Sequence, residues 1–236
     1  MLTTNAMNEV KSMIMVYQRS LGRVDILDLI GQGGPVAIDQ CDLADIDMSG
    51  LAMAEWQFKG CNMSGATVRG SDLSEARFES CRGASANFHG AVLSSAAFLR
   101  SDFNNASFVE TKTHGTSFVE CKLTGANLTG TRSMEFEFRD TLLVDAVLPG
   151  LSFRKARIVG VDFGFANISG CDFREAVFDK CSLRDTHLAG ARFEGADLRG
   201  ADLGGLKIND ASKFWGSTIS KSQAGDILSE LGLVVM

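Results

Sequence analysis

Histidine is the residue type in this chain best suited to acid–base catalysis, and there are three. His89, His114 and His187 lie far apart in the sequence and lack the two-histidine spacing of a zinc-binding helix. There is no dinucleotide-binding glycine motif or serine nucleophile motif, and GQGGP at residues 31–35 lacks the lysine of a phosphate loop. The sequence therefore predicts no catalytic residue, no metal site and no cofactor, and we do not expect an enzyme.

The six cysteines are the other candidates for chemistry. Five of them recur at multiples of the interval from Cys41 to Cys61, a regular spacing that could bring thiols together for a disulfide or a metal ion. Alanine and serine stand at equivalent positions elsewhere, and a buried free cysteine behaves as a small apolar side chain. We therefore expect core filling from all six: Cys41, Cys61, Cys81, Cys121, Cys171 and Cys181.

A five-residue repeat positions these residues, and it runs from Cys41 to Asp210 without an insertion. In its 34 blocks the third residue is mostly large and apolar, with exceptions at Gly83, Thr113 and Ser133, and the first residue is mostly small. Neither the helical period nor the simple strand period equals five. The pattern instead predicts short extended segments separated by turns, with the first and third residues inward. One such unit cannot bury its own core, so the units must stack.

The repeat closely resembles the pentapeptide-repeat family, whose pattern is Ala, then Asp or Asn, then Leu and two variable residues. The segment 191–205, ARFEGADLRGADLGG, is close to that pattern. The resemblance implies an all-β fold, a right-handed quadrilateral β-helix with four pentapeptides per coil. About 8.5 coils then form a rod on the order of 40 Å long at the spacing of paired strands. We expect an N-terminal helical cap at 1–35, the β-solenoid at 36–210, and a C-terminal helix with an apolar tail at 211–236.

The N-terminal segment should cover the first coil, because that coil has an open apolar end and unpaired strand edges. Between Asn5 and Leu21, apolar residues recur at helical spacing, which predicts an amphipathic helix. A second short apolar run, Val24 to Ile30, is followed by GQGGP, which we interpret as a linker. The alternative role for the N-terminal helical segment is recognition of a partner.

The C-terminal segment predicts a short helix that begins at Ser220 or Ser222 and ends near Gly232. An apolar tail follows, and such tails on soluble proteins usually pack against another surface. This ending is similar to that of quinolone-resistance and mycobacterial fluoroquinolone-resistance pentapeptide proteins, which implies a head-to-head homodimer. The alternative is a cap within one chain. The predicted dimerisation residues are Ile227, Leu228, Leu231, Leu233, Val234 and Val235.

The charge and hydropathy of the chain exclude several classes. The net charge of −6 argues against direct binding of nucleic acid, which needs clustered lysine and arginine. No apolar run reaches about 18 residues, so no membrane span is expected. The segment 1–22 lacks the apolar core of a secretion signal, and we expect a cytoplasmic protein.

Acidic residues gather on one face of the predicted solenoid. The blocks that begin at positions 41, 61, 81 and so on, one from each coil, carry seven acids and three bases. One interpretation is a solvated surface with aspartates in turns. The other is a row of carboxylates that imitates a DNA backbone and binds a basic DNA-binding surface. The predicted partner-binding residues are Asp42, Asp45, Asp102, Asp145, Asp162, Asp185 and Asp202.

The resemblance to topoisomerase-protecting members implies a dimeric acidic rod that binds DNA gyrase or topoisomerase IV and protects it from a quinolone or a peptide toxin. The alternative function is an interaction scaffold for another protein partner. Two irregular places interrupt the pattern. Gly83 leaves a large-residue slot empty, which we expect to let the coil pinch or bend. Phe136, after Ser133, takes a small-residue slot, and we expect it either to force a bulge or to face outward as a partner anchor.

Overall fold

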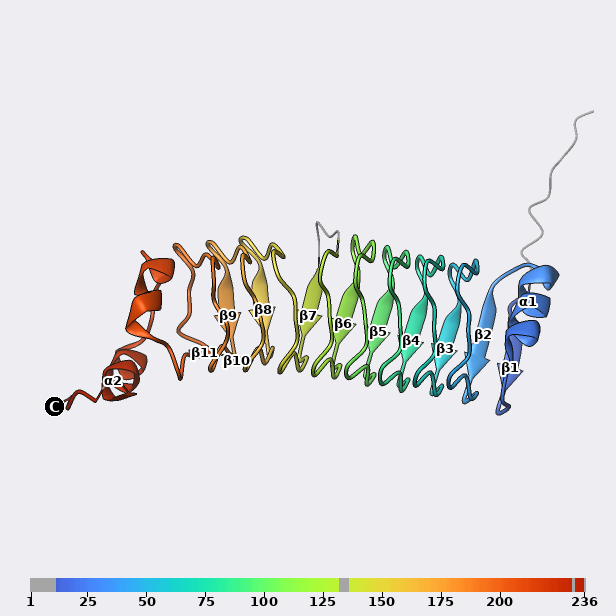
Figure 1. Cartoon of the computed structure of the whole chain (residues 1–236), viewed down its shortest axis with the longest axis horizontal. Coiled ribbons are helices and arrows are strands. Elements are labelled where there is room, and N and C mark those ends of the chain that lie inside the picture. Colours follow the sequence, from blue (N-terminus) through green and yellow to red (C-terminus); the bar gives the residue numbers. More distant parts are fainter. Residues whose placement is uncertain (1–11, 132–135, 231, 236) are drawn as a thin grey trace, which may run out of the picture.

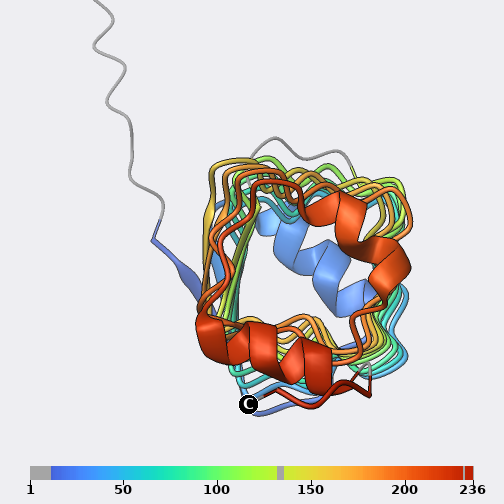
Figure 2. The same cartoon turned by 90° about the vertical axis from the view of Figure 1, so that its left-hand side faces the viewer.

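The computed structural model describes residues 12–131, 136–230 and 232–235. The chain winds into a rod of square cross-section, with helices at both ends (Figure 1, Figure 2). Along one wall of the described chain, nine parallel strands pair in chain order, one from each successive coil. Their bounds are β1 Ile14–Tyr17, β2 Val36–Asp39, β3 Gln57–Lys59, β4 Arg77–Glu79, β5 Ala97–Leu99, β6 Ser117–Val119, β7 Glu137–Arg139, β8 Arg157–Val159 and β9 Val177–Asp179. The predicted quadrilateral β-solenoid is confirmed.

The register of the strands shows that each coil contains four pentapeptides. Phe58 of β3 pairs with Phe78 of β4, which pairs with Phe98 of β5, so each step along the sheet advances the chain by four blocks. Single bridges hold the other walls in the same register, for example Asp47 with Thr67. The side chain at a given place in one coil therefore lies directly over its equivalent in the next coil.

The third residue of each block fills the core with stacked columns of side chains. In the column along the sheet, the ring centroids of Phe58 and Phe78 are 4.9 Å apart, those of Phe78 and Phe98 4.5 Å, and those of Phe98 and Phe118 4.6 Å. Flat rings suit these columns, because rings from successive coils can stack at nearly the spacing of paired strands. Phenylalanine has no polar group that would need a partner inside the rod, which explains 16 phenylalanines beside a single tyrosine.

The first residue of many blocks links its coil to the preceding one through a hydroxyl or a thiol. The Ser71 hydroxyl donates to the carbonyl oxygen of Met48 at 2.7 Å, and the Thr116 hydroxyl donates to that of Leu93 at 2.7 Å. In both pairs the acceptor belongs to the third residue of a block in the coil before. This bond explains why serine, threonine and cysteine can replace alanine at a buried position without leaving a polar atom unpaired.

The fifth residue of nearly every described block has a positive φ angle, which closes the turn at each corner of the coil. Glycine takes this conformation at little cost, and asparagine and aspartate tolerate it better than other residues. This requirement accounts for many of the 25 glycines of the chain. It also places the fifth side chain, where there is one, at an exposed corner.

The N-terminal end differs from the sequence-based expectation. The predicted helix at residues 5–21 is wrong for Ile14–Tyr17, which form β1, and residues 5–11 lie outside the described residues. Val16 of β1 is buried and pairs with Ile38 of β2, so this segment extends the sheet by one coil. Pairing with β2 therefore outweighs the helical spacing of the apolar residues.

The helix of the N-terminal end is α1, Arg23–Gln32, which lies across the first coil (Figure 2). Its Ile26 and Leu29 are buried in the core. The Arg23 side chain donates to the carbonyl oxygen of Asp47 at 2.7 Å and ties the helix to the rod. The helix includes the first two residues of GQGGP, so the linker interpretation is wrong for those two.

The C-terminal end closes the rod with two short strands and two helices. These are β10 Cys181–Ser182, β11 Ala201–Asp202, the 3-10 helix η1 Ile208–Phe214 and α2 Lys221–Glu230 (Figure 1). Phe214 stacks on Phe193 with centroids 4.7 Å apart and so ends a core column. The Gln223 side chain donates to the carbonyl oxygens of Leu198 at 2.7 Å and Ala201 at 2.6 Å, which fastens α2 to the last coil.

The ends of α2 follow the sequence-based prediction. Ser220 caps the N-terminus, because its hydroxyl accepts from the backbone N–H of Gln223 at 3.1 Å and the Gln223 side chain accepts from the Ser220 N–H at 2.6 Å. Gly232 has φ +82°, and the N–H groups of Gly232 and Leu233 donate to the carbonyl oxygens of Ser229 and Leu228. These two bonds form a Schellman motif that ends the helix.

At both Gly83 and Phe136 the structure packs a ring into the rod. A Cβ atom built on Gly83 would lie 2.1 Å from Cε1 of Phe103, so the ring of the next coil already fills the slot that we expected to be empty. Phe136 is half-buried and stacks on Phe138 at 5.0 Å, so its interpretation as an outward anchor is wrong. Beside it, the described pairing of β7 with β8 is reduced to Arg139 with Val159. Ser133 lies outside the described residues.

Candidate functional site

The histidines do not form a site. His89, on one wall, lies 3.6 Å from the carboxylate of Glu110, while His114 and His187 are exposed elsewhere on the rod. Among residues 12–131, 136–230 and 232–235, no group of three or more His, Cys, Asp or Glu side chains could hold a metal ion. In the same ranges, no helix has the length and apolar character needed to cross a membrane.

All six cysteines are buried and free, as the core-filling interpretation expects. Each thiol donates to the carbonyl oxygen of a residue in the preceding coil, for example Cys121 to Phe98 at 3.4 Å and Cys171 to Leu148 at 3.1 Å. Burial, which disfavours the thiolate, raises the pKa of Cys121 to about 11 and that of Cys171 to about 12. Thiolates are the reactive form, so these two thiols have no reactive form near neutral pH.

Because all six thiols are buried, the native protein is expected to resist thiol reagents at pH 8. Treatment with Ellman's reagent should release almost no chromophore until denaturant is added, and then all six cysteines should react. The same protein in denaturant is the control. Rapid reaction of one cysteine in the native state would show that its coil opens or that it is exposed.

The acidic face consists of the blocks that begin at positions 41, 61, 81 and so on, one from each coil. The structure confirms that the second residues of these blocks form one column, the central column, through successive bridges. In order, this column is Asp42, Asn62, Arg82, Asp102, Lys122, Leu142, Asp162, Ser182 and Asp202. Asp102 therefore lies between two bases, and the carboxylates do not form one continuous row.

The fifth residues of the same blocks form a corner column at the edge of the face. It contains Asp45, Asp145 and Asp185, all with positive φ angles. The acids of the two columns are unevenly spread, because four of the seven lie in the last four of the nine blocks of the face. We call these four, Asp145, Asp162, Asp185 and Asp202, the C-terminal acidic patch.

The aspartates of the central column have a structural role as well. The Asp162 carboxylate accepts from the backbone N–H of Gly164 at 2.9 Å, and Asp202 accepts from Gly204 at 2.9 Å. Asp42 and Asp102 make equivalent turns with the second residue after them. One carboxylate oxygen of each is thus held by its own turn, which fixes the direction of the charge.

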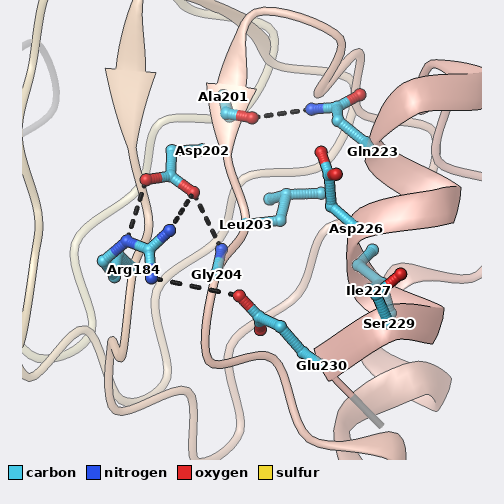
Figure 3. A pocket seen from close by; sticks show the side chains of 10 residues that line it. All are labelled: Arg184, Ala201, Asp202, Leu203, Gly204, Gln223, Asp226, Ile227, Ser229 and Glu230. Carbon is cyan, nitrogen blue, oxygen red and sulfur yellow. Dashed lines mark hydrogen bonds and ion pairs between the residues drawn. The ribbon is translucent and has the colours of Figure 1, made fainter. Parts of the chain in front are cut away.

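One member of the C-terminal acidic patch is neutralised within the chain. Arg184 forms an ion pair with Asp202 at 3.0 Å and approaches Glu230 of α2 at 3.9 Å (Figure 3). The Glu230 carboxylate also accepts from the N–H of Gly205 at 2.7 Å. Arg184, Asp202 and Glu230 border a hollow of about 530 Å³ between the last coil and α2. In the described parts of the chain, the other six acids of the face form no ion pair.

The predicted dimerisation residues lie at the C-terminal end of the rod. Ile227 is half-buried against the core, whereas Leu228 and the tail are exposed, with Val234 at 87%. Leu231 lies outside the described residues. The sequence-based prediction does not include Trp215, which follows the end of the repeat and is 83% exposed. The structure thus adds Trp215 to the apolar surface of this end.

Family models match most of the chain. A model described as a pentapeptide repeat region matches residues 36–108, and one described as pentapeptide repeats matches 101–132, 137–174 and 166–205. The chain belongs to the pentapeptide-repeat family. Sequence comparison with curated proteins finds no match.

Among solved structures, this pentapeptide-repeat protein is similar to QnrB1, which is described as a plasmid-mediated fluoroquinolone resistance protein. The match has a TM-score of 0.62 at 18% identity and covers 94% of this chain and 99% of that chain. HetL, a pentapeptide-repeat protein of the cyanobacterium Nostoc involved in heterocyst differentiation regulation, matches at 20% identity with a TM-score of 0.37, covering 84% and 94%. At such identities the likeness to QnrB1 shows a shared fold.

Proposed function

We propose that this pentapeptide-repeat protein is a non-enzymatic binding protein that engages DNA gyrase or topoisomerase IV in the cytoplasm and protects the enzyme from a quinolone or a peptide toxin. The observation that carries the proposal is the match to the fold of QnrB1 over 94% of this chain. Because QnrB1 is described as a fluoroquinolone resistance protein, a topoisomerase is the first partner to test.

The acidic face supplies the chemistry of the proposed contact. A topoisomerase must hold DNA on a basic surface, and a rigid protein with carboxylates at fixed spacing can occupy such a surface in place of DNA. The turn bonds from Gly164 and Gly204 hold Asp162 and Asp202 in place, so little side-chain entropy is lost when a partner binds. In this proposal the C-terminal acidic patch makes the strongest contact.

A dimer through the C-terminal ends forms part of the proposal. The apolar side chains of Trp215, Leu228, Leu233, Val234 and Val235 are exposed together at that end of the chain, and pairing two copies there would remove them from water. A twofold dimer would also double the length of the acidic rod. Light scattering of the purified chain measures its mass directly.

The experiment is a supercoiling assay with purified DNA gyrase. The protein is expected either to inhibit supercoiling at micromolar concentration or to restore supercoiling in the presence of ciprofloxacin or a peptide gyrase toxin. Bovine serum albumin at equal concentration is the control for nonspecific effects. No effect in any of these arms, with a protein shown to be folded by circular dichroism, would overturn the proposed function.

A further inference from the structure

Phe165 is an exception among the residues that close the corners of the rod. Every other described non-glycine residue with positive φ has a polar or charged side chain. Phe165 has φ +58°, a conformation that is unfavourable for a bulky residue. Its backbone N–H donates to the carbonyl oxygen of Arg184 at 3.0 Å, as at a regular corner. The corner geometry therefore does not explain the choice of phenylalanine.

The core does not explain it either. The side chain of Phe165 is 58% exposed and lies outside the core cluster. Within the described residues its ring contacts no other aromatic ring, whereas the core phenylalanines stack in columns. Phe165 thus adds backbone strain and exposed apolar area to the fold, and it gains neither a place in the core nor an aromatic contact in return.

The surroundings of Phe165 are acidic. Asp145 and Asp185 occupy the same corner column one coil before and one coil after it, and Asp162 belongs to the same block. Leu142, which pairs with Asp162 and is 40% exposed, adds apolar surface to the face. Arg184, whose backbone carbonyl accepts from the Phe165 N–H, has its side chain engaged by Asp202 and Glu230 (Figure 3).

We propose that Phe165 is an anchor on which a protein partner places an arginine side chain. The guanidinium would lie over the ring, while Asp145, Asp162 and Asp185 accept its N–H groups or pair with neighbouring bases of the partner. Arginine suits this place better than lysine, because its planar cation stacks on an aromatic ring and donates to several carboxylates at once. This inference deepens the proposed function, on which it rests for the choice of face, and adds the chemistry of the partner.

The first test compares two labelled peptides of equal charge, hexa-arginine and hexa-lysine, by fluorescence anisotropy with the full chain at low salt. The arginine peptide is expected to bind about 2- to 5-fold more tightly. Phe165→Gly should abolish that preference, and Phe165→Tyr, which retains a ring, should keep it. Equal affinities for the wild-type protein, or an arginine preference that persists in Phe165→Gly, would overturn the inference.

Stability separates a binding role from a structural role. Glycine favours the conformation at position 165, so Phe165→Gly is expected to raise the melting temperature by about 2–4 °C while it weakens binding. Glu55→Gly, at an exposed corner with φ +63° on the opposite wall, is the matched control that should gain stability without losing the arginine preference. A fall in melting temperature for Phe165→Gly would instead assign the ring a structural role and overturn the inference.

The gyrase assay distinguishes the two proposals. If wild-type protein leaves gyrase unaffected but shows the Phe165-dependent arginine preference, the proposed function fails and the anchor stands. If wild-type protein protects gyrase and Phe165→Gly protects it equally well, the proposed function stands and the anchor fails.

Discussion

Gly83→Leu is expected to lower the free energy of unfolding by about 1–3 kcal/mol, although it restores the large apolar residue of the repeat pattern. The reason is the ring of Phe103, whose Cε1 and Cδ1 atoms would lie 2.1 Å and 2.3 Å from a Cβ at position 83. Phe103 is fully buried, and its centroid lies 5.2 Å from that of Phe98. The ring cannot move aside without disturbing the stacked column, so the added side chain overpacks the core.

The double variant tests this explanation. Phe103→Ala alone should cost about 3–5 kcal/mol, because it leaves a cavity the size of a ring. When Gly83→Leu is added to it, the new side chain occupies that cavity, and the double variant should be more stable than Phe103→Ala alone. Urea denaturation followed by circular dichroism measures all three variants. Gly31→Ala in α1, where nothing lies within 4 Å of a new Cβ, is the control and should be neutral or slightly stabilising. Additive losses in the double variant would contradict the explanation.

The regular part of the fold could be predicted because one short pattern specifies both the core and the register. A block of five with two inward residues has few ways to bury them. Over 34 blocks the pattern stays recognisable although a few blocks depart from it. The burial of Cys41, Cys61 and Cys81 in one column followed from a coil of four blocks. The places of the acidic face followed in the same way, since a fixed register assigns every residue to a wall.

The N-terminal strand, the exceptions to the pattern and the contacts of α2 with the last coil could not be predicted, because contacts outside the pattern decide them. Ile14 and Tyr17 fit a helical spacing, and the pairing with β2 selects the strand instead. The space at Gly83 is filled by a ring that comes from the next coil. The ion pair of Arg184 with Glu230 depends on how α2 folds back on the last coil.

Neutralising three members of the C-terminal acidic patch is expected to reduce gyrase protection about tenfold, if each charge contributes about 0.5 kcal/mol to binding. The variant is Asp145→Asn, Asp162→Asn and Asp185→Asn together. Asparagine should preserve the fold, because Asn105 already occupies a place in the corner column at φ +56°. Asn62 in the central column accepts from the N–H of Ser64 at 3.2 Å, as the aspartates do with their own turns. The substitution therefore removes charge and leaves the turns in place.

The control carries the same change of net charge on other walls: Glu55→Gln, Glu75→Gln and Glu110→Gln. Both triple variants should melt within a few degrees of the wild-type protein. In the supercoiling assay with ciprofloxacin, the control should protect as the wild type does, and the asparagine variant should need about ten times more protein. Its dependence on salt should also be weaker, because fewer charges attract the partner. Equal loss in both variants would mean that net charge acts without regard to its place, and the acidic face would then have no special role in binding.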